Sequence, residues 1–294
     1  MIEQLLSILV VGAMISAVYA LVAIGFTMIF GVGGVLNLAH GALIMIGAFA
    51  YLAFTSTSGA LSLPPVVGFV VAVAVTAGAS YVLYAGLVTF IEDDIVITFL
   101  ATVVVALLVT ELVIIQFGSA PSQLVPIVSG SIYLESVGTR LRYVQLIAFV
   151  VSWIAIGALW YYVSKTDEGR SILAASMSTR GAELTGVNLR KVKSRTWLIA
   201  GAFAGIAGVF IGTLQSTSPQ MWLSPLALAF IIVVVGGIGS IKGSVIAAYL
   251  IGYLETASVE FLGPSFQGVL SLIVLVAILL VLPNGLYGRE LVHE

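Results

Sequence analysis

Long apolar runs separated by short polar segments dominate the pattern of this chain. Five of them have about the 20 residues that an α-helix needs to cross a lipid bilayer, and they occupy 5–30, 65–90, 95–117, 143–163 and 197–216. Shorter apolar runs occupy 41–54, 226–240, 244–261 and 268–283. Strands of a membrane barrel alternate apolar and polar residues over about 10 positions, and these runs do not. The pattern therefore predicts an all-α bundle of eight or nine transmembrane helices, some of them short or broken.

Composition strengthens the membrane prediction and removes several other classes of protein. The 294 residues are 61% hydrophobic and only 8% charged, whereas a soluble domain carries about a quarter charged residues. A net charge of −2 offers no basic field for nucleic acid. The absence of cysteine excludes disulfides and thiolate metal sites. No Lys or Arg precedes the first apolar run, so we expect a first span there and not a signal peptide. We expect one transmembrane domain over 1–294.

The distribution of positive charge predicts how the bundle is oriented. The first basic residue is Arg140, and seven of the eleven basic residues lie in the loop 165–195. Because loops rich in Lys and Arg stay in the cytoplasm, we expect this loop on the cytoplasmic side. Counting helices from it places Lys242 and Arg289 on the same side, and Arg140 and Arg142 on the opposite side. The side of the N-terminus stays open, because the run 41–54 is short enough to be a half-helix.

The loop 165–195 has the composition of short amphipathic helices outside the membrane. Its apolar positions are Ile172, Leu173, Ala175, Met177, Ala182, Leu184 and Val187, with breaks at Gly181 and Gly186. Two interpretations are open. The helices rest on the lipid surface, or they form a docking surface for a cytoplasmic partner.

The segment GVGGVLNLAHG (31–41) interrupts two apolar runs with glycines, an asparagine and a histidine. Gly31, Gly33 and Gly34 can end a span without strain. Asn37 and His40 are three residues apart, so on a helix they share a face and can satisfy backbone groups that the break frees. The break is then a capped helix end, or it lines a substrate path, because irregular backbone within a membrane persists next to protein or a cavity.

Four glycines in the run 197–216 recur at spacings of four, three and four. They are Gly201, Gly205, Gly208 and Gly212. This spacing places them on one helix face, where a neighbouring backbone can approach closely. Packing within the chain and a role in movement or subunit association both fit this pattern.

Groups for catalysis or nucleotide binding are missing from the sequence. The glycine-rich segment 233–244 lacks the Gly-Lys-Ser/Thr that a phosphate-binding loop needs, so energy from a nucleotide would have to come from another chain. Glu111 and Glu255 stand alone within apolar runs, where a carboxylate faces a hydrogen-bonded neighbour, the interface or a cavity. His40 and His293 do not form a metal site, since His293 lies on the polar tail. We predict a protein that is not an enzyme.

Four segments carry motifs that are specific when taken together and in order. They are GVLNLAHGALIMIGA (34–48), GRSILAASMSTRGAELTGVN (169–188), VVVGGIGSIKGSVIAAYLIGYLE (233–255) and LPNGLYG (282–288). In this order they resemble the signatures of the permease subunits of branched-chain amino-acid ABC importers. The second segment is similar to the cytoplasmic loop with which that family meets its ATPase. Leu173, Leu228 and Lys242 depart from residues that are frequent in the family.

The resemblance implies an assembly in the cytoplasmic membrane. A second permease, identical or homologous, and two cytoplasmic ATPases that use ATP and Mg would join this chain, and an extracytoplasmic binding protein would deliver the substrate. The chain itself would bind no cofactor, metal or nucleic acid. Expected substrate-path residues are Asn37, His40, Gly41, Gly47 and Glu255. Expected residues of the ATPase coupling loop are Arg170, Arg180, Glu183, Leu184, Gly186 and Val187.

Three alternatives to amino-acid transport are considered for the same residues. Related permeases for urea and short amides share these signatures, so the substrate is not decided by them. An ion-coupled secondary transporter would need paired ionisable residues within the spans, and a purely structural membrane subunit would not need the glycine breaks.

Overall fold

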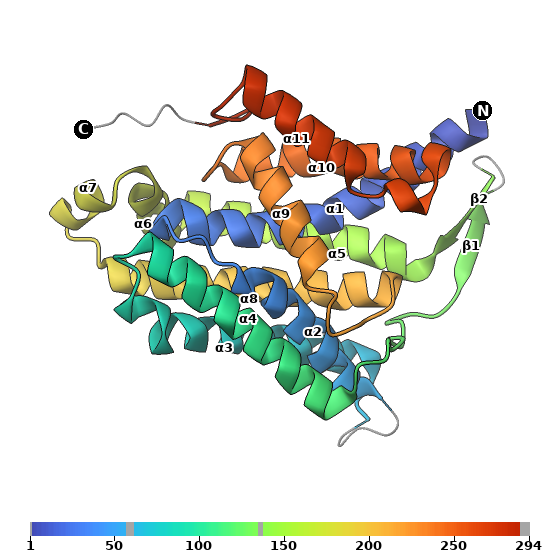
Figure 1. Ribbon diagram of the computed structural model, residues 1–294, viewed down its shortest axis with the longest axis horizontal. Helices are drawn as coiled ribbons and strands as arrows, with labels where there is room; N and C mark the ends of the chain where they lie inside the picture. The colour runs from blue at the N-terminus through green and yellow to red at the C-terminus, as the bar shows by residue number, and fades with distance from the viewer. Residues whose placement is uncertain (1, 57–61, 135–137, 289–294) are drawn as a thin grey trace.

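The computed structural model describes residues 2–56, 62–134 and 138–288 as a bundle of helices with one small hairpin (Figure 1). The helices of the first half are α1 (Ile2–Gly33), α2 (Ala39–Thr55), α3 (Pro65–Gly86), η1 (Val88–Phe90) and α4 (Ile95–Phe117). The hairpin of β1 (Ser131–Leu134) and β2 (Thr139–Arg142) follows. The remaining helices are α5 (Tyr143–Lys165), α6 (Asp167–Met177), α7 (Thr179–Leu184), α8 (Leu189–Leu214), α9 (Leu223–Gly236), α10 (Ile241–Leu262), η2 (Pro264–Phe266) and α11 (Val269–Val281).

Each predicted apolar run corresponds to a helix, which confirms the all-α transmembrane bundle. Seven stretches in the described residues are long and apolar enough to cross a membrane. The two shorter helices, α2 and α9, have 17 and 14 residues, so each spans roughly 21–25 Å at 1.5 Å per residue. These are the short helices that the pattern predicted, and with them nine apolar helices make up the bundle.

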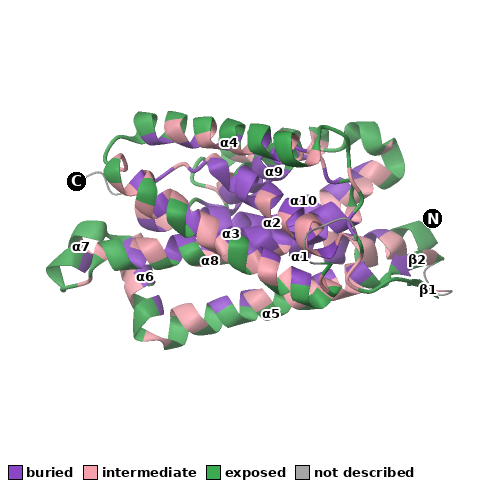
Figure 2. Ribbon diagram, turned by 90° about the horizontal axis from the view of Figure 1, so that it is seen from below, coloured by how far each residue is buried: buried purple, intermediate pink, exposed green. Residues whose placement is uncertain are grey.

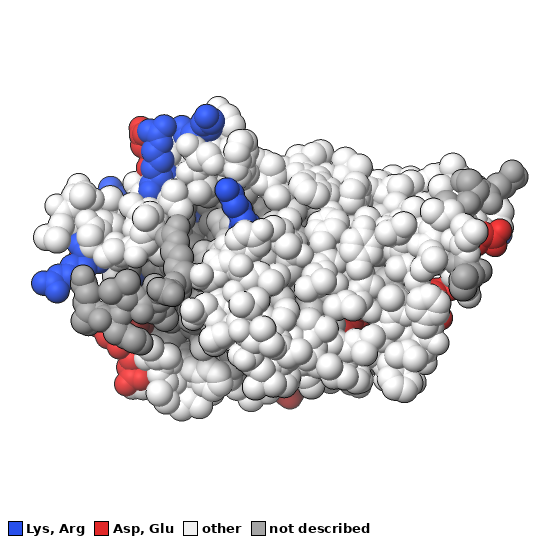
Figure 3. Space-filling model, turned by 90° about the horizontal axis from the view of Figure 1, so that it is seen from above, with Lys and Arg blue, Asp and Glu red and all other residues white. Residues whose placement is uncertain are grey.

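The two ends of the bundle differ in charge and structure. Helices α6 and α7 lie at one end and the β1–β2 hairpin lies at the other (Figure 1), and Lys and Arg gather mainly at the α6–α7 end (Figure 3). We call these the basic end and the hairpin end. Arg142 donates a hydrogen bond to the carbonyl of Leu214, which joins the hairpin to the last turn of α8. Arg140 and Arg142 therefore lie opposite the basic loop, as predicted.

The structure also shows at which end of the bundle the first helix begins, which the sequence left open. Helix α1 begins at the hairpin end and finishes at the basic end (Figure 1). Gly239, just before α10, lies against Gly31 near the end of α1, so Lys242, the second residue of α10, is at the basic end, on the side predicted for it. Arg289 and His293 lie outside the described residues.

Helix α1 occupies the centre of the bundle, where the buried residues concentrate (Figure 2). Its residues from Ser16 to Ile29 are all buried, and α8, α10, α5 and α9 surround it. Close contact with α10 depends on small residues, since a Cβ at Gly12 would lie 2.6 Å from the Tyr253 ring. Nearer the basic end, the hydroxyls of Thr27 and Ser244 are hydrogen-bonded at 2.6 Å. The outer helices α4, α5 and α11 expose mostly apolar side chains, as expected for surfaces that contact lipid.

The glycine stripe of α8 contacts two neighbouring helices within the chain. A Cβ at Gly205 would lie 3.0 Å from the Val73 Cα on α3. A Cβ at Gly208 would overlap the backbone of Ile44 on α2, and one at Gly212 would lie 3.1 Å from the Ala48 Cβ. Gly201 faces α3 in the same way, next to Ser80. The stripe thus lets α8 approach both α2 and α3.

The C-terminal segment completes the end of α9. The last carbonyls of a helix lack partners within that helix, and here the amides of Leu286 and Tyr287 donate to the carbonyls of Val235 and Gly236 at 2.8 and 3.0 Å. Gly237 takes a φ of 97°, a conformation that is unstrained only for glycine. The motif LPNGLYG is therefore part of the basic end.

Candidate functional site

The break between α1 and α2 is a short irregular segment at residues 34–38. The amide of Gly34, at φ 64°, donates to the Phe30 carbonyl and closes α1. The amide of Leu38 donates to the Thr102 hydroxyl on α4 at 3.2 Å. Thr102 thus satisfies the backbone of the break from another helix, and no motif in the sequence marks this residue.

His40 connects the start of α2 to the middle of α1. Its side chain is fully buried, and its Nε2 is hydrogen-bonded to the Val22 carbonyl at 3.1 Å. The Phe26 ring contacts the imidazole edge to face, with 5.8 Å between ring centroids. Gly25 makes room for the ring, because a Cβ there would lie 2.7 Å from the His40 Cε1. His40 thus bonds to α1 and not to the break itself.

Asn37 is also buried, at 1% exposure, but it precedes the helix on which His40 lies. Neither polar atom of its side-chain amide has a hydrogen-bond partner among the described residues. Its backbone carbonyl accepts from the amide of His40 at 3.2 Å. The expected shared helical face is therefore replaced by a turn, and the Asn37 side chain does not cap α2.

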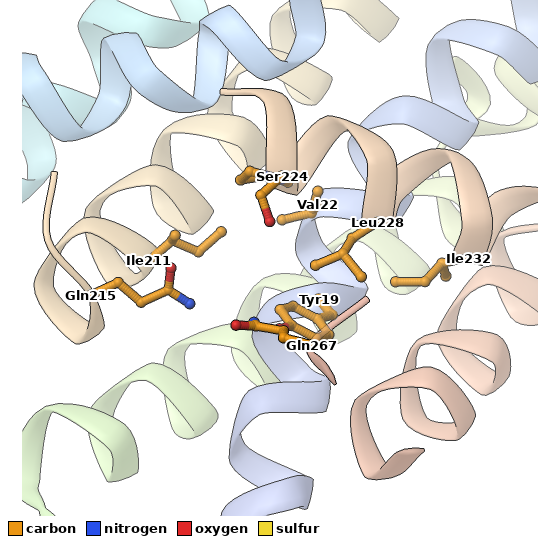
Figure 4. Close-up of a pocket in the computed structure, with 9 residues that line it drawn as sticks. Tyr19, Val22, Ile211, Gln215, Ser224, Leu228, Ile232 and Gln267 are labelled. Carbon is orange, nitrogen blue, oxygen red and sulfur yellow. The ribbon is translucent and has the colours of Figure 1, made fainter. Parts of the chain in front are cut away.

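A small polar cavity lies between α1, α8, α9 and the turn before α11 (Figure 4). Its volume is about 10 Å³, enough for roughly one water molecule. Polar side chains line it together with apolar ones; the polar ones are Tyr19, Gln215, Ser224 and Gln267. Val22 also lines the cavity, so the residue that accepts the His40 hydrogen bond forms part of its wall.

Two of the segments that line this cavity lie toward the hairpin end of the bundle. Gln215 follows the last residue of α8, and Gln267 follows η2; both segments lie toward the hairpin end (Figure 1). Tyr19 and Val22 belong to the middle of α1. The cavity therefore lies between the hairpin end and His40, in the first turn of α2.

The other predicted path residues occupy packing positions. A Cβ at Gly41 would lie 2.9 Å from the Leu226 Cβ on α9, and one at Gly47 would lie 2.8 Å from the Gly205 Cα on α8. Glu255, at 2% exposure, accepts hydrogen bonds from the amide of Gly268 at 2.9 and 3.0 Å and from the Ser271 hydroxyl. Its carboxylate therefore binds the N-terminus of α11, where negative charge is stabilising.

The loop 165–195 forms two short helices, α6 and α7, as its pattern predicted. A small core joins them to α1 and α8, and its buried members are Val32, Ile172, Ala175, Ala182 and Val192. Val187 packs against this core and is half-buried, whereas Leu184 is 83% exposed. Met177 and Leu173 are also exposed, at 65% and 45%.

Gly186 ends α7 with a defined geometry. Its φ is 84°, its amide donates to the Glu183 carbonyl, and the Val187 amide donates to the Ala182 carbonyl. This is the Schellman pattern of a glycine-terminated helix. Arg170 pairs with Asp167 within α6. Arg180 and Glu183 are exposed and form no ion pair among the described residues.

Glu111 and Glu255, the two acids that the sequence analysis considered within apolar runs, have different surroundings. Glu255 is held by α11, as described, but Glu111 is exposed on α4, six residues before that helix ends. Among the described residues no three His, Cys, Asp or Glu side chains are close enough together to hold a metal ion.

The fold and these sites define a class of protein: a multi-pass helical membrane protein with a broken helix, a small polar cavity within the membrane and an amphipathic pair of helices outside it. The family model described as "Branched-chain amino acid transport system / permease component" matches residues 8–281. The chain therefore belongs to this family of transport permeases, as its motifs predicted.

Individual relatives cover nearly the whole chain. The high-affinity branched-chain amino acid transport system permease protein LivH of Escherichia coli (strain K12) is 28% identical, over 96% of this chain and 95% of its own. The corresponding protein BraD of Pseudomonas aeruginosa is 28% identical over 97% and 96%. The probable permease LivH of Methanocaldococcus jannaschii is 28% identical over 95% and 91%. No solved structure matches the chain.

Proposed function

We propose that this chain is a permease subunit of an ABC importer that moves branched-chain or other amino acids across the cytoplasmic membrane. It would pair with a second permease, two cytoplasmic ATPases that use ATP and Mg, and an extracytoplasmic binding protein. The family membership supports the transport role. The sequence has no phosphate-binding loop, so ATP hydrolysis is assigned to the partner subunits.

One structural observation carries the ATP-driven part of the proposal. At the basic end, α6 and α7 lie beyond the last residue of α5 and expose Leu184, Met177 and Leu173. Apolar side chains that neither the bundle nor a core covers are expected at a protein interface. The positive-inside bias places this surface in the cytoplasm, where an ATPase subunit could bury it.

The substrate path is proposed to run past the polar cavity and the break. Tyr19, Gln215, Ser224 and Gln267 would offer hydrogen bonds to an amino acid or a small amide. Beyond Val22 lie the buried Asn37, in the break, and the buried His40, in the first turn of α2. The cavity has a volume of about 10 Å³, room for roughly one water molecule, so helices must move apart for a larger solute. These side chains carry no charge, and selectivity would then reside mainly in the binding protein.

Reconstitution tests this proposal against an ion-coupled carrier. The chain, its second permease, the two ATPases and the binding protein, in sealed vesicles, should accumulate leucine, isoleucine or valine only with ATP. Omission of either the ATPases or the binding protein should stop uptake. Accumulation by this chain alone on a proton or sodium gradient would show that it is a secondary transporter. Uptake of urea or a short amide in place of amino acids would reassign the substrate within the family.

A further inference from the structure

A second hollow of the molecule is a groove of about 470 Å³ between α5 and α8 at the basic end. It is distinct from the polar cavity of Figure 4. The α5 wall includes Ala155 and Ala158, and the α8 wall includes Leu198, Ile199 and Phe203. The two alanines leave room between the helices, and the walls are apolar. A volume of this size lies in the range of small-molecule sites, roughly 300–1,000 Å³.

The mouth of the groove is lined by the polar residues Tyr162, Glu168 and Arg195, and two exposed lysines lie about one turn from it. The Arg195 Nη2 pairs with the Glu168 Oε1 of α6 at 2.7 Å, and Arg195 remains 44% exposed. The Tyr162 hydroxyl donates to the same carboxylate at 2.9 Å. Lys191 precedes Arg195 by one turn on the same face of α8, and Lys165 follows Tyr162 by three residues on α5. Both lysines are exposed, and neither forms an ion pair in the described part of the chain.

The depth of the groove matches one leaflet of a bilayer. From Arg195 to Phe203 the α8 wall descends about 12 Å at 1.5 Å per residue, and half of a hydrocarbon core is about 15 Å. Tyrosines are enriched at the level where lipid headgroups meet the core, and Tyr162 lies at the polar mouth. Charge therefore occupies the headgroup level of the groove, and apolar side chains occupy the acyl level.

We propose that this groove binds an anionic phospholipid of the leaflet at the basic end. One acyl chain lies between α5 and α8, and the headgroup phosphate accepts hydrogen bonds from Arg195 with support from Lys191 and Lys165. A guanidinium has five N–H donors, so its bond to Glu168 leaves others for the phosphate. Basic pockets between transmembrane helices on the cytoplasmic side have the chemistry for such headgroups. The proposal does not depend on the transport assignment.

Lipid retention by the purified full-length permease tests the headgroup part. Native mass spectrometry would compare phosphatidylglycerol with phosphatidylcholine, added in equal amounts to the protein in detergent. Each basic residue is expected to contribute about fivefold to retention of the anionic lipid. K165A/K191A/R195A should therefore lose its preference for phosphatidylglycerol by tenfold or more. The matched control R170A/R180A/R190A removes three positive charges outside the groove and should keep it. Equal loss in both triple variants would overturn the site.

Three further experiments distinguish a bound lipid from other occupants of the groove. Ala158→Phe should fill the groove and reduce retention of both lipids, while Ile154→Phe, on the exposed face of α5, should not. On the wild-type chain, inorganic phosphate should not displace phosphatidylglycerol; displacement would identify a free-anion site and overturn the acyl part. A cysteine at Leu198 should react with a membrane-soluble maleimide in the assembled transporter. Cross-linking of that cysteine to the second permease instead would show that a protein helix fills the groove.

Discussion

Leu184 is the residue on which the coupling proposal depends most directly. It is 83% exposed on α7, whose last turn is fixed by Gly186. Its near neighbour Val187 is half-buried against the core of the loop, so Leu184 and not Val187 is available to a partner. Both residues were expected in the ATPase coupling loop, but the Schellman turn at Gly186 separates them.

We expect Leu184→Asp to remove ATPase binding while the bundle stays intact. Burial of a leucine contributes about 1.5–3 kcal/mol, so ATPase affinity should fall by about tenfold or more, and the desolvated charge adds to the loss. The measurement is co-purification of the ATPases with the variant permease, together with substrate uptake.

Arg180→Ala is the matched control for this change, because an exposed ion pair contributes only about 0–1 kcal/mol. It should weaken ATPase binding far less than Leu184→Asp does. Full co-purification and continued transport by Leu184→Asp would show that the loop rests on lipid and does not couple the subunits.

At the scale of single helices, the packing of α8 depends on close approach to two neighbouring helices. Its glycine stripe meets α3 through Gly201 and Gly205 and α2 through Gly208 and Gly212. Packing of this kind replaces the hydrophobic driving force that is missing between helices in lipid.

Gly208→Ala should destabilise the bundle, because the new Cβ would overlap the backbone of Ile44 on α2. Overpacking of this kind costs about 1–3 kcal/mol. The control is Gly157→Ala on α5, where a Cβ would meet nothing within 4 Å and helix propensity favours alanine by up to about 1 kcal/mol. Thermal denaturation in detergent, followed by size-exclusion chromatography, should show a lower midpoint for Gly208→Ala alone. Equal midpoints for the two variants would contradict the observed α8–α2 contact.

The short elements show what a sequence pattern can and cannot predict. The apolar run 226–240 became α9 at Leu223–Gly236, because Gly237 turns at positive φ and Ser240 caps the next helix by accepting from the Gly243 amide. The break at 31–41 was predicted from its glycines and from His40. Its bonding to Thr102 and Val22 joins residues from different helices, and no local spacing reveals such pairs.

The polar cavity was missed for the same reason. Tyr19 lies in the middle of an apolar run, whereas Gln215, Ser224 and Gln267 lie at or near the ends of such runs, and the four come from separate parts of the chain. Periodicity can assign each to a helix or turn, but only the packing of α1 between α8, α9 and the turn before α11 brings them together. Glu255 was recognised as unusual, and its partner Gly268 follows from the same tertiary packing.

For the whole molecule, the orientation is the property that is easiest to check. The chain contains no cysteine, so a single introduced cysteine reports on one position. Glu3→Cys and Ser131→Cys at the hairpin end should react with a membrane-impermeant maleimide on intact cells. Arg180→Cys, at the basic end, should react only after the membrane is permeabilised, because basic loops remain in the cytoplasm. Labelling of Arg180→Cys on intact cells would reverse the orientation, and protection of Glu3→Cys would contradict the course of α1.

The central place of α1 also has a consequence for how the protein is made. The neighbour that covers much of α1, α10, begins about 200 residues after α1 ends, and at roughly 5–20 residues per second synthesis takes about 10–40 s to reach it. For that interval Thr27 lacks the hydroxyl of Ser244, and the Gly12 face lacks the Tyr253 ring. A nascent chain that stalls before α10 therefore leaves the α10-facing side of the innermost helix uncovered, as a surface that the quality-control machinery of the membrane can recognise.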